Sequence, residues 1–159
     1  MRKTRASILL ATALATAATA AAGSLATTSG SAWYRRLSKP SWQPPAQAFP
    51  LVWTTLYGLI AYGGARALSR EDEERRSALG RALAVNLALN AAWPALFFKA
   101  RSPRLALAEI VVLNASNLVL VRRAGRADRA AGAMLVPYAA WTAFATALNA
   151  SIARRNPSH

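Results

Sequence analysis

The side chains most able to do chemistry in this sequence are aromatic rings and uncharged amides at helical spacing. The chain has five tryptophans and no cysteine. Asn86, Asn90 and Trp93 fall at positions i, i+4 and i+7, which places them on one face of a helix. Tyr138 and Trp141 share a second such face. Aromatic walls favour flat, apolar ligands, because stacking and dispersion act over a large area. Core packing explains any one of these rings equally well, so both interpretations stay open.

Glu109 is the sharpest single polar signal, because it is the only charged residue between positions 105 and 121. A carboxylate is costly in hydrocarbon, so we expect it to face the interior of a helix bundle. The favoured interpretation is a structural hydrogen bond to Asn86, to Asn90 or to backbone broken near Pro94. A proton or ligand site is the alternative.

Metal and hydrolytic chemistry have little support in the sequence. Cysteine is absent and the single histidine, His159, is the last residue, so we expect no metal site. Neither a hydrolytic triad nor a glycine-rich phosphate loop is visible.

These residues belong to five nearly uncharged stretches, each close to the roughly 17–25 residues needed to span a bilayer. Four prolines interrupt the segment between the first two stretches. We therefore predict an all-α, five-helix transmembrane bundle in a single domain, residues 1–159. The predicted helices are 6–27, 49–68, 79–99, 104–122 and 130–153, with a Pro-rich loop at 33–48.

Two charged segments are expected to connect the helices. Residues 70–76 form a predicted mixed-charge connector preceded by Ser69 as a helix N-cap, and residues 122–126 are expected to end the fourth helix. The first helix has a second interpretation, because residues 1–24 also resemble a secretory signal peptide. We favour a retained helix, since its small residues suit close packing in a membrane.

The net charge of +14 indicates an anionic partner, which could be nucleic acid or membrane lipid. The Lys and Arg residues cluster between uncharged stretches, as in loops that flank membrane spans, so we expect membrane lipid and no nucleic acid as a partner. Twelve basic residues fall on the side of the N-terminus and eight on the other, which predicts a cytoplasmic N-terminus. The Ala- and Arg-rich composition suggests a bacterium, and we expect its plasma membrane.

The tryptophans are part of a longer pattern. Its segments are Trp33-Tyr34-x-x-Leu37-x-Lys39-Pro40-Ser41-Trp42-x-Pro44-Pro45, Val52-Trp53-x-x-Leu56-Tyr57, Leu89-Asn90-x-x-Trp93-Pro94, Ala108-Glu109-Ile110 and Val136-Pro137-Tyr138-x-x-Trp141-x-x-Phe144-Ala145. This pattern resembles the TspO/MBR family, the tryptophan-rich sensory and translocator proteins. With Asn149 it covers nearly the whole chain.

The resemblance implies a five-helix membrane bundle, often a homodimer, with a pocket between the helices beneath the Pro-rich loop. Members of the family bind porphyrins and haem-pathway tetrapyrroles, so a porphyrin-like small molecule is the implied partner. The cholesterol motif of mitochondrial relatives lacks its tyrosine here, between Leu148 and Arg154, which argues against a sterol role. Matching motif positions imply a pocket lined by Trp42, Trp53, Tyr57, Asn90, Trp93, Tyr138, Trp141 and Ala145.

The chain's own residues limit how a tetrapyrrole is held. Haem iron usually takes His, Cys, Met or Tyr as its axial ligand, and the first three types are nearly absent. We therefore expect porphyrin or haem as a ligand and no obligatory cofactor, held by aromatic contact and by basic partners of the propionates. Arg35, Arg36 and Lys39 are the candidates, although solvated loop charges are the simpler interpretation.

The leading hypothesis is a membrane receptor or sensor for porphyrins that regulates tetrapyrrole and stress metabolism. A second is an enzyme of light- or oxygen-dependent porphyrin degradation, in which Trp53 and Trp141 would be the redox-active side chains. A third is a transporter of porphyrins or other apolar ligands. The scarcity of charged residues within the spans counts against an ion-coupled pump.

Overall fold

The computed structural model of the protein describes residues 4–157, and these form helices with no strand among them. His159, and Arg2 and Lys3 of the charge count, lie outside this range. The expectation of an all-α fold with five long helices is confirmed. The elements are α1 (Arg5–Ala26), the short α2 (Ala32–Arg36), α3 (Ala48–Leu68), α4 (Glu73–Pro94), its π-helical continuation η1 (Ala95–Lys99), α5 (Pro103–Ala127) and α6 (Arg129–Arg155).

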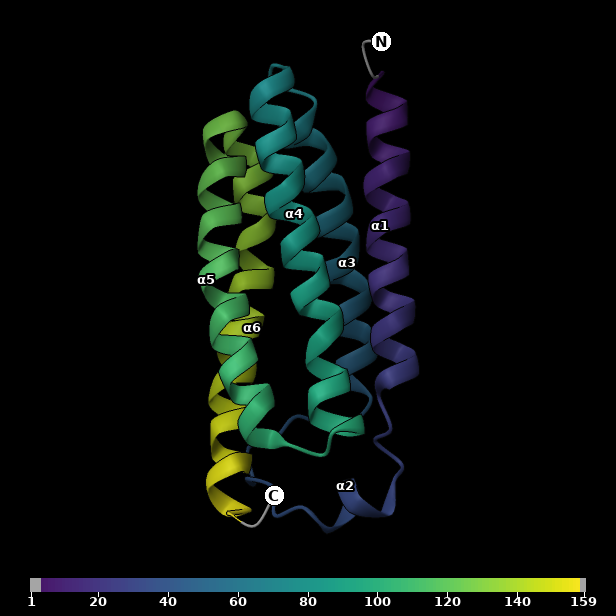
Figure 1. Ribbon diagram of the computed structural model, residues 1–159, viewed down its shortest axis with the longest axis vertical. Helices are drawn as coiled ribbons and strands as arrows, with labels where there is room; N and C mark the ends of the chain where they lie inside the picture. The colour runs from purple at the N-terminus through teal and green to yellow at the C-terminus, as the bar shows by residue number, and fades with distance from the viewer. Residues whose placement is uncertain (1–3, 158–159) are drawn as a thin grey trace.

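The five long helices run side by side along the long axis of the molecule (Figure 1). Helix α1 lies at one edge and packs on α3 and α4, while α5 packs on α4 and α6. One end of the bundle, here the loop end, holds α2, the Pro-rich loop and the C-terminus. The opposite end, here the hairpin end, holds the start of α1 and the α3–α4 and α5–α6 connections.

Among the described helices, α1, α4 with η1, α5 and α6 are each long and apolar enough to cross a membrane. The protein is a multi-pass integral membrane protein. Helix α3, with 21 residues, is not in that group of four, but it packs between α1 and α6 as a member of the same bundle. The buried core of these helices is dominated by leucine, alanine and isoleucine side chains.

Helix α4 begins earlier than the sequence analysis predicted. Asp72 is its N-cap and accepts a hydrogen bond from the Arg75 backbone N–H at 2.9 Å. Acidic side chains in the first turn are favourable at the positive end of the helix dipole. Ser69 instead closes the C-terminus of α3. The prediction of a connector through residue 76 was therefore wrong, because four of its seven charged residues belong to the first turn of α4.

Helix α5 also continues past its predicted end at residue 122, and it reaches Ala127. Asp128 follows directly and caps α6 by accepting from the Ala131 N–H at 2.9 Å. The two helices leave this turn very close together. A Cβ added at Gly132 would lie 2.6 Å from the Gly125 Cα, so only glycine fits there.

Two features of the backbone shape the loop end. Pro94 has no N–H to donate, and the chain beyond it widens into the π-helical turn of η1. The chain then reverses through Arg101, at φ 54°, and Ser102 caps α5 ahead of Pro103.

The predicted loop at 33–48 contains the short helix α2 at its start. The single domain over residues 1–159 stays a prediction.

Candidate functional site

A network of amides and hydroxyls crosses the middle of the bundle. Asn86 on α4 donates to the Asn117 Oδ1 at 2.6 Å and to the Ser116 Oγ at 3.1 Å, both on α5. The Tyr138 hydroxyl on α6 donates to the Asn86 Oδ1 at 3.0 Å. Asn86 itself has no exposed surface. One side chain thus joins three helices.

The network continues toward α3 through the second asparagine of α4. Asn90 donates to the Tyr138 hydroxyl at 3.0 Å and accepts from the Tyr57 hydroxyl at 2.9 Å. On the other side, Asn117 donates to the Thr142 Oγ1 at 2.8 Å. The polar layer, as we call it, consists of Tyr57, Asn86, Asn90, Asn114, Ser116, Asn117, Tyr138 and Thr142.

Four aromatic rings gather between the polar layer and the Pro-rich loop. Trp141 on α6 lies 5.9 Å from the Phe49 ring of α3 and 5.3 Å from the Phe144 ring. Trp42 of the loop meets Phe144 edge-on at 5.9 Å, and 49% of its surface is exposed. We call Trp42, Phe49, Trp141 and Phe144 the aromatic cluster. It joins a loop residue to two long helices.

Trp53 connects this region with the polar layer. Its ring lies 5.2 Å from that of Tyr57 and 6.2 Å from that of Tyr138. Ala145 is half-buried on α6, one turn from Trp141. Five of the eight predicted pocket residues therefore belong to the polar layer or the aromatic cluster, and Trp53 and Ala145 lie beside these groups. Asn90 is the point where α3, α4 and α6 meet.

Trp93 lies in a different group of rings. It stacks on Phe97 at 4.9 Å and meets Phe98 edge-on at 6.2 Å. Its indole N–H donates to the Asn149 Oδ1 at 3.0 Å, and Asn149 donates to the Pro103 carbonyl at 2.8 Å. Trp93 thus packs at the loop end, in the same cluster as the rings of η1 and of α2. Its indole N–H already has a hydrogen-bond partner.

The three basic candidates of the loop end differ in how they are held. Arg35 donates to the Gly30 carbonyl, and Arg36 is exposed. Lys39 lies over the Tyr34 ring, 4.5 Å from its centroid, and donates to the Leu37 carbonyl at 3.2 Å. Partial burial lowers the pKa of Lys39, while burial raises the pKa of Tyr34.

Comparison of the sequence with known proteins identifies the family of the chain. The sequence profile of the TspO/MBR family matches residues 10–155. The chain belongs to the TspO/MBR family. The tryptophan-rich protein TspO of Chlorobaculum tepidum is 37% identical over 138 residues, which cover 86% of this chain and 87% of that protein. The translocator protein of Sus scrofa is 39% identical over 127 residues, 78% of this chain and 75% of its own length. The tryptophan-rich sensory protein of Cereibacter sphaeroides is 35% identical over 124 residues, 78% of this chain and 77% of its own length.

Glu109 behaves differently in this TspO/MBR protein from the way its sequence suggested. Both carboxylate oxygens are buried, and within residues 4–157 neither has a hydrogen-bond partner. Asn86 and Asn90, its predicted partners, are engaged within the polar layer. The predicted structural hydrogen bond was therefore wrong. The amides bond to hydroxyls and amides because those groups face them directly across the helix contacts.

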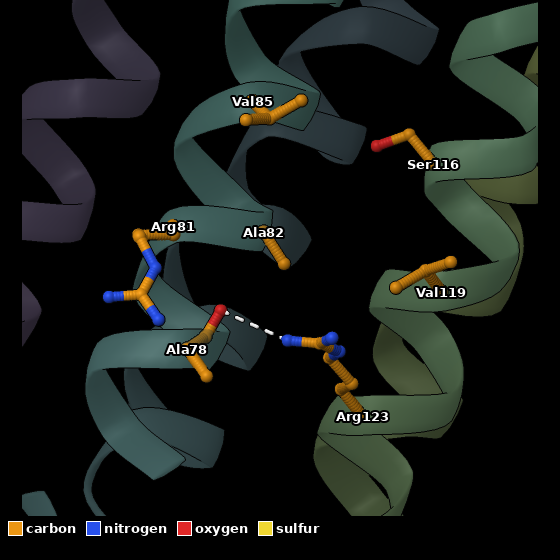
Figure 2. Close-up of a pocket in the computed structure, with 7 residues that line it drawn as sticks. All are labelled: Ala78, Arg81, Ala82, Val85, Ser116, Val119 and Arg123. Atoms are coloured by element: carbon orange, nitrogen blue, oxygen red, sulfur yellow. Dashed lines mark hydrogen bonds between the residues drawn. The ribbon is translucent and has the colours of Figure 1, made fainter. Parts of the chain in front are cut away.

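A groove of about 450 Å³ opens between α4 and α5, nearer the hairpin end (Figure 2). In Figure 2, Val85 of α4 lies opposite Ser116 of α5, and Ala82 lies opposite Val119. Arg123 reaches from α5 to donate to the Ala78 carbonyl at 3.2 Å, and Arg81 also lines the groove. None of the predicted pocket residues lines this groove, so it is separate from the aromatic cluster.

Sequence reasoning missed the residue that anchors the Pro-rich loop of this TspO/MBR protein. Asn156, just after α6, accepts from the Ser38 N–H at 2.9 Å and donates to the Ser38 carbonyl at 3.0 Å. It also donates to the Ile152 carbonyl at 2.8 Å. The only local signal is an asparagine at a helix C-terminus, which says nothing of a partner 118 residues away.

Proposed function

We propose that this TspO/MBR protein is a membrane receptor or sensor that binds a porphyrin-type tetrapyrrole at the aromatic cluster. Trp42 would cover the ligand from the loop, and Trp53 and Trp141 would contact its face. Tyr57, Asn90 and Tyr138 would form the floor, with Ala145 on the α6 wall. Trp93, at the end of α4, would support the site through its stacking on Phe97 of η1.

One observation carries this proposal. Rings from the loop, α3 and α6 converge at one end of the bundle above a floor whose hydrogen bonds are made within the protein. A large, flat, apolar ligand gains contact area from such rings and takes no hydrogen bond away from the floor. Half of the Trp42 surface is exposed and available for that contact.

The charged edge of a porphyrin would face the basic residues of the loop end. Arg36 is exposed there, and Lys39 is held beside the Tyr34 ring. Arg35 would need to leave its bond to Gly30 before it could pair with a propionate. Because binding would rest on rings and charge, we expect free-base porphyrin and haem to bind with similar affinity.

Titration of the purified protein with protoporphyrin IX in the dark tests the proposal. Quenching of tryptophan fluorescence that saturates, with no change in the porphyrin spectrum on later illumination, supports a receptor. A new absorbing product that a Trp141→Phe variant fails to form would support the degrading enzyme instead. Absence of quenching would remove both.

We further propose that the protein lies in a bacterial plasma membrane as a homodimer with a cytoplasmic N-terminus. The hairpin end carries the larger share of Lys and Arg, which supports this orientation. The natural chain has no cysteine, so single substitutions give clean labels. An impermeant thiol reagent on whole cells should label Arg36→Cys and leave Ser77→Cys unlabelled. The reverse pattern would invert the orientation.

A further inference from the structure

A small cavity at the hairpin end has a different chemistry from the aromatic cluster. It lies between α1 and the end of α3 and has a volume of about 160 Å³. Basic side chains line its outer rim, and an apolar wall leads away from them toward the middle of the bundle. The lining residues are Arg5, Leu9, Tyr62, Ala65, Arg66, Ser69 and Arg70.

Arg66 of α3 and Arg70, two residues after its end, are held in place by one carboxylate. The Asp128 Oδ1 accepts from the Arg66 Nε at 2.9 Å, and its Oδ2 lies 3.6 Å from the Arg70 Nε. Asp128 is fixed in turn, because it caps α6 through the Ala131 N–H. Each guanidinium has five N–H donors, so these contacts orient the groups while leaving most donors for another acceptor.

Charge within the cavity is not balanced. Three arginines line it, and Asp128 is the carboxylate that faces two of them. The side chains of Arg66 and Arg70 keep 34% and 51% of their surface exposed, whereas that of Asp128 keeps 10%. The guanidinium groups at the rim are therefore more exposed than the carboxylate of Asp128 that pairs with them.

The apolar part of the cavity continues from the rim in the direction of the bilayer interior. Leu9 lies one helical turn inward from Arg5, and Tyr62 lies one turn inward from Arg66. Both are exposed on the surface, Leu9 by 41% and Tyr62 by 51%. A positive rim at the level of the headgroups with an apolar wall below it matches an amphipathic molecule that has an anionic head.

We propose that this cavity binds an anionic phospholipid, with the headgroup phosphate at Arg5, Arg66 and Arg70 and an acyl chain along Leu9 and Tyr62. Planar guanidiniums suit a phosphate, because they donate paired hydrogen bonds to its oxygens. The groove of Figure 2 also carries arginine at the hairpin end, but Arg123 there donates to a backbone carbonyl of α4. The site is distinct from the proposed porphyrin site at the opposite end.

The test counts lipids retained by the full-length protein. Protein purified in dodecyl maltoside is titrated with palmitoyl-oleoyl phosphatidylglycerol or phosphatidylcholine and followed by native mass spectrometry. We expect preferential retention of phosphatidylglycerol. The double variant Arg5→Gln/Arg70→Gln should bind it about 25-fold more weakly, at about fivefold for each arginine removed. It leaves the Arg66–Asp128 pair intact.

The matched control is Arg36→Gln/Arg104→Gln, which removes the same charge from the loop end. Its affinity for phosphatidylglycerol should stay within about twofold of the wild type. Equal losses in both double variants, or equal retention of the two lipids by the wild type, would overturn the proposal. Displacement of the lipid by millimolar inorganic phosphate would assign the arginines to a soluble anion and also overturn it.

A second variant separates a lipid from a headgroup alone. Leu9→Ser places a hydroxyl on the acyl path and leaves the arginines in place. It should weaken binding of the long-chain phosphatidylglycerol several-fold and leave binding of dihexanoyl phosphatidylglycerol unchanged. Equal behaviour of the two lipids would contradict an acyl chain at this wall. Far-ultraviolet circular dichroism of each variant verifies that the helices are retained.

Discussion

The polar layer and the aromatic cluster lie next to each other in the bundle but are held together by different interactions. In the polar layer every asparagine oxygen that crosses between helices accepts a hydrogen bond, as with Asn86, Asn90 and Asn117. In the aromatic cluster the contacts are between rings, and Trp42 stays half exposed. Hydrogen bonds are directional and fix helix positions, whereas ring contacts have broad minima. The first region therefore fixes the helix positions, and the second is where we propose that the ligand binds.

The largest effect should come from breaking the polar layer. Asn86→Leu removes the partner of Asn117, Ser116 and Tyr138 at once. A buried polar group left without a partner costs about 1–3 kcal/mol, so the melting temperature in detergent should fall clearly. Fluorescence-detected thermal unfolding measures it.

The control for Asn86→Leu is Ala88→Leu, which adds a leucine to the exposed face of the same helix. It should leave the melting temperature nearly unchanged. If Asn86→Leu unfolded at the wild-type temperature, the polar layer would not be what holds the helices in register.

The aromatic cluster should show the opposite pattern, a loss of binding without a loss of stability. Trp42→Ala removes a half-exposed ring whose described ring contact is with Phe144. Loss of one stacking contact corresponds to about a five- to tenfold weaker affinity for protoporphyrin IX. Quenching titrations measure the affinity, and thermal unfolding measures the stability.

Leu25→Ala provides a matched change near the loop end, because Leu25 is exposed on α1 and is outside the aromatic cluster. Its porphyrin affinity should equal that of the wild type. A Trp42→Ala variant with unchanged affinity but a lowered melting temperature would make the ring part of the packed core.

The fold and the candidate site differ in how far the sequence determined them. The five helices follow from uncharged stretches of spanning length, and the face shared by Asn86 and Asn90 follows from helical periodicity. The start of α4 did not follow, because acidic residues such as Asp72 and Glu73 are equally suited to a solvated loop and to a helix N-terminus. Local pattern cannot distinguish these two environments.

The side-chain contacts around the candidate site were harder to predict than the helices that carry them. Helical spacing places Asn90 and Trp93 on one face, yet Asn90 bonds toward α3 and α6 while Trp93 turns to Asn149 and the η1 rings. Near Pro94 the helix widens, so the direction of Trp93 depends on tertiary packing. The unpartnered carboxylate of Glu109 likewise depends on which groups face it across helices, and sequence spacing carries no such information.

A smaller effect should appear when the loop that carries Trp42 is held less tightly. Asn156→Ala removes both hydrogen bonds to Ser38, a few residues before Trp42. Each bond contributes about 0.5–1.5 kcal/mol, so the loop should open more often and porphyrin dissociation should accelerate about threefold or more. Stopped-flow displacement measures the rate. Asn156→Asp keeps the acceptor for the Ser38 N–H and should give an intermediate rate, whereas a wild-type rate in Asn156→Ala would show that Ser38 does not restrain the loop.

The smallest effect should be the dependence of stability on acidic pH. It arises at the hairpin end, away from both the polar layer and the aromatic cluster. The bond from Arg66 and the Ala131 N–H lower the pKa of Asp128 to about 2. Its folded-state pKa is below the ordinary value near 3.8, so the stabilisation is fully present above about pH 4 and is lost as the pH falls toward 2. Asp128→Asn keeps a good N-cap but removes the charge. Its melting temperature should lie a few degrees below that of the wild type at neutral pH, and the difference should shrink as the pH is lowered from 4 to 2. A difference that stays constant over this range would mean that the ion pair between Asp128 and Arg66 contributes nothing to the stability of the bundle.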